Sequence, residues 1–347
     1  MRKPSPSGRR PTPQDRRRIH QRVVQPTTYL SRRGGCIATM WVVARADRDL
    51  VTRGLEDLGG VARLRLSLGR ARRMRKVRRS ATNQTLGLIT TIAARDDMFS
   101  WAYPAGYFAT GRVALAKIQQ ALLEKEADDP PKRILDLPCG YGRLLRYFRA
   151  TWPEAEIVAG ELVPDAVAFC QRTFSATAPQ SKEPLWEADI GGNYDLIWSG
   201  SLLTHFDEDH WKPILHHFAE ALTVRGVLVF STIGKSGYEI LQGSDAYPWI
   251  TAVIPPRYAL SDAGAGHIVQ SIADTGFGYS HYPDHDDDPY GLAVALPEWA
   301  ADRIVASGMT VVRHEEGGWG SQDLWSVTRS ARTEHPDDVT ATGIGGY

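Results

Sequence analysis

An acidic residue and two closely spaced glycines lie within the stretch RILDLPCGYGRLLRYF, residues 133–148. Asp136 precedes Gly140 by four residues, and Gly142 follows two residues later. Glycines at this spacing let the backbone of a turn approach a bound nucleotide, and the acid can hydrogen-bond a cationic or amine-bearing ligand. Leu145 stands where a dinucleotide-binding turn has its third glycine. The turn therefore indicates a nucleotide-like cofactor other than NAD.

Such a turn needs a strand before it and a helix after it, and the sequence predicts both. Short apolar runs typical of buried strands are found at 133–138, 155–162, 194–201 and 225–234. Helical patterns separate them at 142–152, 164–174 and 208–222. This alternation predicts an α/β fold with a doubly wound, Rossmann-like parallel sheet, whose ligand lies beyond the carboxyl ends of the strands. A helix is expected afterwards at 264–276, followed by late strands at 290–297, 309–315 and 323–329.

The segment ILDLPCGYGR resembles the first motif of class I S-adenosylmethionine-dependent methyltransferases, with Pro138 at the position of the first glycine. Proline is tolerated there if its missing N–H is not a donor to the ligand. Three further segments resemble later motifs at the expected spacing: the strand ending in Glu161, NYDLIWSGSLLTHF and LTVRGVLVFST. The resemblance extends from about Tyr103 to Thr232. It implies the class I methyltransferase fold, methyltransferase activity and S-adenosyl-L-methionine as the cofactor.

The resemblance also implies roles for single residues. Glu161 would hydrogen-bond the ribose hydroxyls, with Leu162 beside the adenine. The third strand is poorly defined: Asp189 is expected near the adenine amine, Ser181 is an alternative, and a plain surface loop is a third. The complete set of implied cofactor-binding residues is Asp136, Cys139, Gly140, Tyr141, Gly142, Glu161, Leu162, Asp189, Ser199, Gly200 and Ser201.

One histidine follows the motif of the strand at 194–201. If the acceptor is a hydroxyl, its proton must be removed, and histidine is suited to this at neutral pH. His205 is therefore the candidate catalytic base, and a structural capping role is its alternative. The loop HYPDHDDD at 281–288 has metal-binding residue types but no fixed ligand spacing, so no metal site is predicted.

The acceptor is less well defined by the sequence. The leading hypothesis is O-methylation of a small molecule or glycan. The alternatives are a nucleic-acid methyltransferase and a non-catalytic member that binds cofactor or a partner through the same fold. The run Pro-Pro-aromatic, typical of methylases of base nitrogens, is missing after the strand at 194–201.

Charge divides the chain into unequal parts. Residues 1–80 have 22 basic and 5 acidic residues, whereas the rest has 19 basic and 35 acidic ones. The acidic remainder disfavours a nucleic-acid groove, because phosphates need clustered cations. We expect a disordered basic arm at 1–35, a basic helical extension at 36–95, the methyltransferase domain at 96–330 and a disordered tail at 331–347.

The basic extension is expected to be a solvated helix, and its alternative is a peripheral contact with membrane lipid or another anion. Three widely spaced cysteines, no apolar run long enough for a bilayer and no secretory signal indicate a cytoplasmic protein.

Overall fold

The computed structural model describes residues 60–101, 103–125, 129–179, 188–242, 260–282 and 290–330. The basic arm expected at 1–35 and the tail expected at 331–347 lie outside these ranges, as does the part of the extension before residue 60.

A six-stranded sheet has the strand order β2-β1-β3-β4-β8-β7. Its strands are β1 Arg133–Asp136, β2 Glu156–Ala159, β3 Tyr194–Ser199, β4 Leu222–Thr232, β7 Met309–Trp319 and β8 Gln322–Arg329. The first four are parallel, which confirms the predicted α/β fold with its parallel sheet. β8 runs antiparallel between β4 and β7, so a late hairpin extends the sheet on one side.

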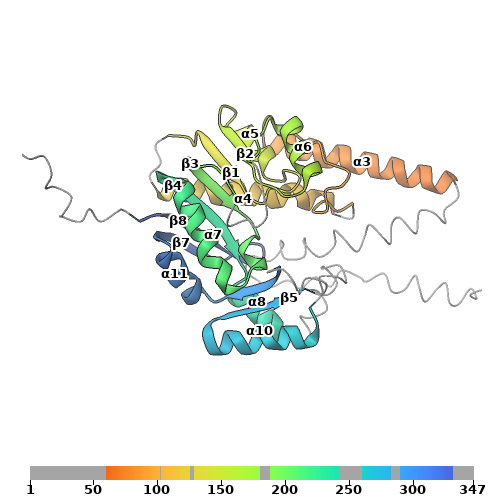
Figure 1. Cartoon of the computed structure of the whole chain (residues 1–347). Coiled ribbons are helices and arrows are strands. Elements are labelled where there is room, and N and C mark those ends of the chain that lie inside the picture. Colours follow the sequence, from red (N-terminus) through yellow and green to blue (C-terminus); the bar gives the residue numbers. More distant parts are fainter. Residues whose placement is uncertain are drawn as a thin grey trace, which may run out of the picture. The chain divides into compact units, whose positions relative to one another are not determined.

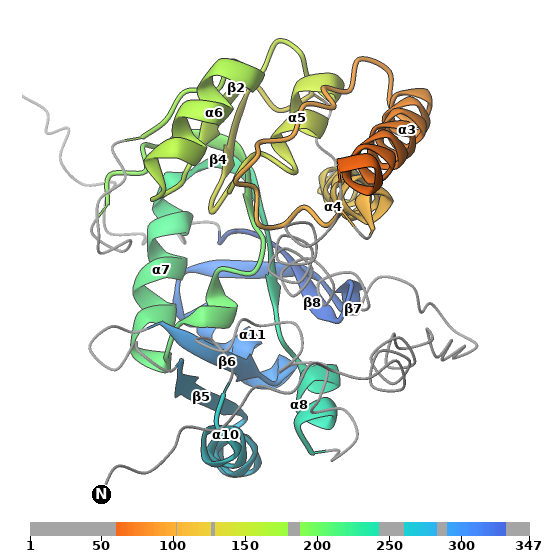
Figure 2. The ribbon, with the colours of Figure 1, turned by 90° about the vertical axis from the view of Figure 1, so that its right-hand side faces the viewer.

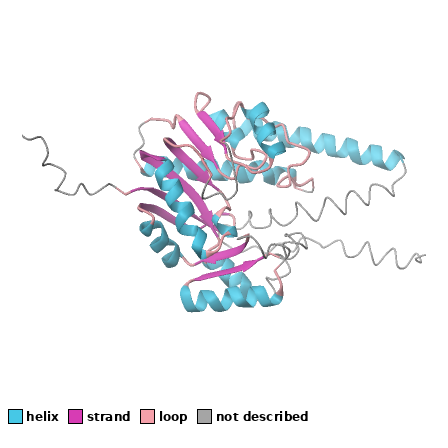
Figure 3. Cartoon of the chain, in the orientation of Figure 1, coloured by secondary structure: helices cyan, strands magenta, loops and turns pink. Residues whose placement is uncertain are grey.

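Helices cover both faces of this sheet. Neighbouring strand residues such as Ile134 and Leu135 point to opposite faces, and both are fully buried. Ile134 belongs to a core formed with α3 Gly60–Gln84, α4 Pro104–Glu124, α5 Leu145–Thr151 and α6 Pro164–Phe174. Leu135 belongs to a core formed with α7 Glu208–Ala221 and α11 Pro297–Ala306. Figures 1 and 3 show the strands between these two sets of helices. The sheet is therefore doubly wound.

A smaller unit follows β4, and we call it the cap. It comprises α8 Lys235–Gln242, α10 Asp262–Thr275, β5 Phe277–His281 and β6 Gly291–Ala295. Ser261 caps α10 by accepting a hydrogen bond from the N–H of Gly264, and the helix ends at Gly276 with φ +85°. β5 and β6 pair with each other as a separate two-stranded sheet (Figure 2). The late strand expected at 290–297 is thus present as β6, whereas its partner β5 was not expected.

In the described residues, the third strand of the predicted fold is represented by one isolated bridge. Thr177 forms a parallel bridge with Val158 of β2: its N–H donates to the Ile157 carbonyl and its carbonyl accepts from the Ala159 N–H, both at 2.8 Å. The described part of the segment that follows, 188–193, contains no strand.

Candidate active site

The cofactor turn lies at the carboxyl end of β1, and its two glycines serve different purposes. Gly142 has φ +74°, and an added Cβ would lie 2.2 Å from the ring of Phe174, so the turn packs tightly against α6. Gly140 has φ +52°, and nothing lies within 4 Å of its Cβ position. Any larger residue would be strained at both positions. The open side of Gly140 gives a ligand direct access to the backbone.

Glu161 holds the end of β2 against this turn. One carboxylate oxygen accepts the N–H of Gly140 at 2.8 Å. The other accepts the N–H groups of Leu162 and Val163 at 2.8 and 3.0 Å, directly before α6. Glu161 therefore joins the two segments that the sequence assigns to the cofactor. Leu162 is half exposed beside it.

Two polar groups at neighbouring strand ends are buried without a partner in the described ranges. They are Oδ2 of Asp136, at the end of β1, and Oγ of Ser199, at the end of β3. Asp136 pairs in register with Trp198, the residue before Ser199, so both lie at the same edge of the sheet. Burial raises the pKa of Asp136 well above its usual value, although the charge of Arg143 acts in the opposite direction. A buried polar atom without a hydrogen bond is costly, so this arrangement suits a site completed by a ligand.

Cys139 and Tyr141 flank Gly140, and their side chains point to α6. The Cys139 sulfur lies 4.0 Å from that of Cys170, and both are 3.4 Å from the carbonyl oxygen of Gly140. The ring of Tyr141 packs edge-on against Phe169 of α6, with centroids 6.0 Å apart. The side chains of Cys139 and Tyr141 therefore anchor the turn to α6. Only the backbone of these two residues is left to face a ligand at the turn.

Gly200 and Ser201 continue β3 and connect it to the late hairpin. An added Cβ on Gly200 would lie 3.0 Å from the ring of Trp198. The Ser201 N–H donates to the Ser231 hydroxyl at 2.8 Å, and the Ser201 hydroxyl accepts from the Gln322 amide at 2.8 Å. Ser231 in turn donates to Gln322 Oε1 at 2.6 Å. Sequence reasoning missed Ser231 and Gln322, because the contact between Ser201 and Gln322 spans 121 residues.

His205 lies on the short 3₁₀ helix Leu203–His205 and contacts the cap. Its Nδ1 is 3.1 Å from the Gly291 carbonyl oxygen and 3.1 Å from the Tyr282 hydroxyl. Because a carbonyl oxygen only accepts, Nδ1 of the neutral ring carries the proton and Nε2 is left as an acceptor. Burial lowers the pKa of His205 to about 4, despite the opposing effect of the Gly291 carbonyl. The ring is therefore neutral at neutral pH.

Asp189 is a correction to the sequence-based assignment. It is exposed and accepts the N–H of Gly191 at 2.9 Å in a turn. Gly191 lies beside the side chains of Tyr194 and Arg133, the first residues of β3 and β1. The turn is therefore at the amino edge of the sheet, opposite the cofactor turn. Ser181, the alternative for the adenine amine, lies outside the described residues.

Sequence reasoning also missed a segment that passes beside the turn. Arg146 of α5 is fully buried and donates to the carbonyls of Ile89 and Thr91 at 2.7 and 3.0 Å. Arg95 forms an ion pair with Asp165 at the start of α6. Residues 89–95 therefore connect the two helices that flank the turn. Arg146 lies on the apolar side of the predicted helix 142–152, and this is the one feature of the sequence that indicates a buried polar contact there.

The described ranges contain neither a cluster of metal ligands nor a helix that could span a membrane. No three His, Cys, Asp or Glu residues gather there as a metal would require, and most of the acidic loop 281–288 falls outside those ranges. In the same ranges, no helix has both the length and the apolar character to cross a bilayer.

Comparisons with known proteins support the reading of the turn. Residues 107–277 match the family model of a methyltransferase domain. The malonyl-[acyl-carrier protein] O-methyltransferase of Anoxybacillus flavithermus is 30% identical over 132 residues, which are 38% of this chain and 50% of that protein. The trans-aconitate 2-methyltransferase of a Mycobacterium species is 25% identical over 194 residues, covering 41% of this chain and 76% of that protein.

The chain thus spans about half the length of the malonyl relatives that it matches. Among solved structures, an S-adenosylmethionine-dependent methyltransferase from Clostridium acetobutylicum is similar at a TM-score of 0.42 and 12% identity, over 65% of this chain and 92% of that one.

The described geometry and the family match agree with each other. The glycine turn follows the first strand of a doubly wound sheet, and the acidic residue that ends the next strand is bonded to it. Most of the matched range falls on these strands and helices. Residues 107–277 of this chain are therefore similar to a methyltransferase domain.

Proposed function

We propose that this chain binds S-adenosylmethionine at the carboxyl ends of β1, β2 and β3 and catalyses methyl transfer to an oxygen of a small-molecule acceptor. The observation that carries the proposal is the unpartnered buried Oδ2 of Asp136 at the end of β1, four residues before Gly140, whose Cβ position is open. The amine of the cofactor's methionine part suits Asp136, and its ribose hydroxyls suit Glu161. When bound, S-adenosylmethionine supplies an electrophilic methyl group.

The chain's own residues would orient the acceptor and accept its proton. His205 is the proposed base, because its neutral ring leaves Nε2 as an acceptor while the cap fixes Nδ1. A positioned base contributes about 10²–10⁴-fold to a rate. We therefore expect His205→Ala to lower turnover by that factor and to leave cofactor affinity nearly unchanged. Full activity of this variant would exclude the role.

The name of the trans-aconitate relatives supports a small-molecule acceptor, and the name of the malonyl relatives, whose acceptor is joined to a carrier protein, supports an oxygen as the methylated atom. A glycan remains within the proposal, since its hydroxyls present the same chemistry.

Calorimetry tests the cofactor part of the proposal. S-adenosylmethionine and its demethylated product should bind in the micromolar range, about 8 kcal/mol. NAD should not compete, because Leu145 replaces the third glycine of its turn. Glu161→Ala should weaken binding by about 1–3 kcal/mol, because the ribose hydroxyls lose a charged acceptor. The absence of heat with both ligands, on folded protein, would refute the proposal.

We also propose that α3 provides a peripheral contact with an anionic surface. Six of its seven cations between Arg70 and Arg79 are exposed, while Met74 and Ala81 pack into the core with α4. The expected result is binding to vesicles that contain anionic lipid, lost at high salt, and no binding to neutral vesicles. Equal binding to both kinds of vesicle would contradict an electrostatic contact.

A further inference from the structure

A histidine and a carboxylate form a pair on the late hairpin that the proposed mechanism leaves unused. Nε2 of His314 on β7 lies 2.9 Å from Oδ2 of Asp323 on β8. The Asp323 side chain is 1% exposed, whereas that of His314 is 25% exposed. The His314 ring stacks on Trp325 with centroids 4.2 Å apart. A buried carboxylate thus supports an imidazole that reaches solvent.

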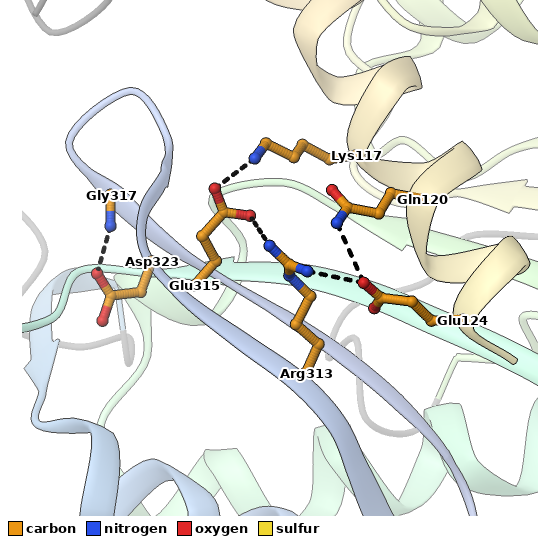
Figure 4. Close-up of polar contacts among 7 residues, drawn as sticks. All are labelled: Lys117, Gln120, Glu124, Arg313, Glu315, Gly317 and Asp323. Carbon is orange, nitrogen blue, oxygen red and sulfur yellow. Dashed lines mark hydrogen bonds and ion pairs between the residues drawn. The ribbon is translucent and has the colours of Figure 1, made fainter. Parts of the chain in front are cut away.

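Asp323 is held firmly on several sides. Its other oxygen accepts the N–H of Gly317 at 3.1 Å (Figure 4). An added Cβ on Gly234, just after β4, would lie 2.1 Å from Oδ2, so glycine is required for the carboxylate to fit. Burial raises the pKa of Asp323, while its hydrogen bond with His314 acts in the opposite direction. The position of Asp323 in the pair is therefore fixed both by the hairpin and by the segment that follows β4.

The hydrogen bond sets which nitrogen of His314 is free. Because a carboxylate only accepts, Nε2 carries the proton of the neutral ring and Nδ1 is a bare acceptor. Nδ1 has no hydrogen-bond partner in the parts of the chain that the structure describes. An acceptor nitrogen supported by a carboxylate attracts O–H donors and repels carboxylates.

The pair lies at the cofactor edge of the sheet. Ser199, Phe230, Trp325 and His314 are register partners in one row across β3, β4, β8 and β7. β7 is two strand spacings from β4, about 10 Å. Asp323 pairs with Thr232 at the end of β4. In the proposed function the methylated atom lies near the end of β3 and His205, so a group that contacts His314 would be a separate part of the acceptor.

We propose that His314, fixed by Asp323, accepts a hydrogen bond from a second hydroxyl of the acceptor, so that the acceptor is a polyhydroxylated molecule such as a sugar or polyol. The inference rests on the proposed function and specifies its substrate class. It predicts methylation of a hydroxyl rather than of a carboxylate, because a carboxylate-rich acceptor would meet the charge of Asp323.

The first experiment identifies the bond that is formed. Wild-type protein is incubated with S-adenosylmethionine labelled in its methyl group and with a small-molecule cell extract, and the labelled products are treated with mild alkali. A methyl ether resists alkali, whereas a methyl ester releases labelled methanol. We expect resistant label on a polyhydroxylated product. Release of the label, or a resistant product with a single hydroxyl, would overturn the inference and leave the methyltransferase function intact. Failure of the wild type to bind S-adenosylmethionine or to transfer label would refute the function itself.

The second experiment uses the purified acceptor. His314→Gln keeps an N–H donor for Asp323 and removes the Nδ1 acceptor. It should raise KM roughly 10- to 100-fold with kcat nearly unchanged, as expected for the loss of a contact that binds ground state and transition state equally. Affinity for the demethylated cofactor, measured on the same sample, should not change.

Asp323→Asn provides an independent variant. An asparagine that offers its amide to Nε2 turns Nδ1 into the protonated nitrogen, so KM should rise by a similar factor. The matched control is His216→Gln on α7, which breaks an imidazole–carboxylate pair with Glu220 at a side chain that is 61% exposed. It should change nothing. An unchanged KM in both hairpin variants, or a loss confined to kcat, would exclude the recognition role.

Discussion

Asp136 combines a cost to folding with a proposed role in binding. Its carboxylate is buried, its pKa is raised by that burial, and one oxygen has no partner among the described residues. Because the pKa of the Asp136 carboxyl is higher in the folded state, its contribution to the free energy of unfolding is fully present below the unfolded pKa. This contribution is lost as pH rises through the folded pKa. At neutral pH the carboxylate therefore destabilises the ligand-free fold.

Asp136→Asn should consequently leave the thermal stability of the ligand-free protein unchanged or higher at pH 7. It should weaken cofactor binding by about 1–3 kcal/mol, because the ligand amine loses a charged acceptor. Melting curves and calorimetry on the same preparation check both halves. Asp189→Asn, at the opposite edge of the sheet, is the control and should alter neither quantity. A large loss of stability together with full affinity would show that Asp136 is structural.

His205 should give stability a distinct pH dependence. Its pKa is lowered by burial from 6.5 to about 4, so the unfolded chain binds more protons between these values. Stability from this group is then complete above about 6.5 and falls as pH decreases towards about 4. His205→Gln should flatten that part of the curve. Denaturant unfolding at several pH values measures it, and an identical slope in wild type and variant would contradict the buried neutral ring.

At the scale of elements, an ion-pair chain ties β7 to α4 (Figure 4). Lys117 bonds Glu315, and Arg313 contacts Glu315 at 3.1 Å and Glu124 at 2.7 Å. Burial alone would raise the pKa of Glu315, but hydrogen bonds and charge from Lys117 and Arg313 leave it lowered. Such a carboxylate stabilises above its unfolded pKa, and the effect is lost as pH falls through the folded value.

Glu315→Gln should therefore lower the free energy of unfolding at pH 7 by about 1 kcal/mol or less, since the partners are partly exposed. The difference from wild type should vanish in acid. Glu239→Gln, in an exposed pair on α8, is the control and should have no measurable effect. A deficit that persists at low pH would mean that packing, and not charge, holds the hairpin to α4.

The elements also show what the sequence could predict. Local spacing predicts the strand, the turn and the helix start that position Asp136, Gly140, Gly142 and Glu161, and the structure has these elements, with Glu161 bonded to Gly140. Asp189 lies in a turn at the amino edge of the sheet, and the described residues between β2 and β3 hold only the bridge at Thr177, so motif spacing had no described strand to follow.

The residues that sequence reasoning missed depend on distant pairing. Gln322 and Asp323 lie at the cofactor edge of the sheet only because β8 pairs with β4 in antiparallel register. The residue pattern of β8 does not reveal that β4 is its neighbour. A short strand of mixed polarity shows the same pattern whichever strand of a sheet it pairs with. For the same reason β5 was not recognised as the partner of β6.

At the scale of the whole molecule, the basic arm should be dispensable for the cofactor. Among the described residues, those that form the turn and its supports come from Ile89 onward. Deleting residues 1–35 should leave affinity for S-adenosylmethionine unchanged, because that segment lacks the apolar content to join a core. Calorimetry and circular dichroism on the truncated chain check this. An unfolded or non-binding truncation would assign the arm a structural role.

The position of the cap has a consequence for how such a chain can change. The proposed cofactor contacts come from residues before β4, whereas the cap and α11 lie between the end of β4 and the start of β7. The chain leaves the sheet at Thr232 and rejoins it at Met309, beside β8 and one strand from where it left. A chimera that exchanges residues 235–308 for those of a relative would keep the methyl-donor half whole. Under the proposed function, the part of the acceptor site that the cap forms could therefore change by replacement of one continuous block of sequence, while the proposed donor contacts and the His314–Asp323 pair stay in place.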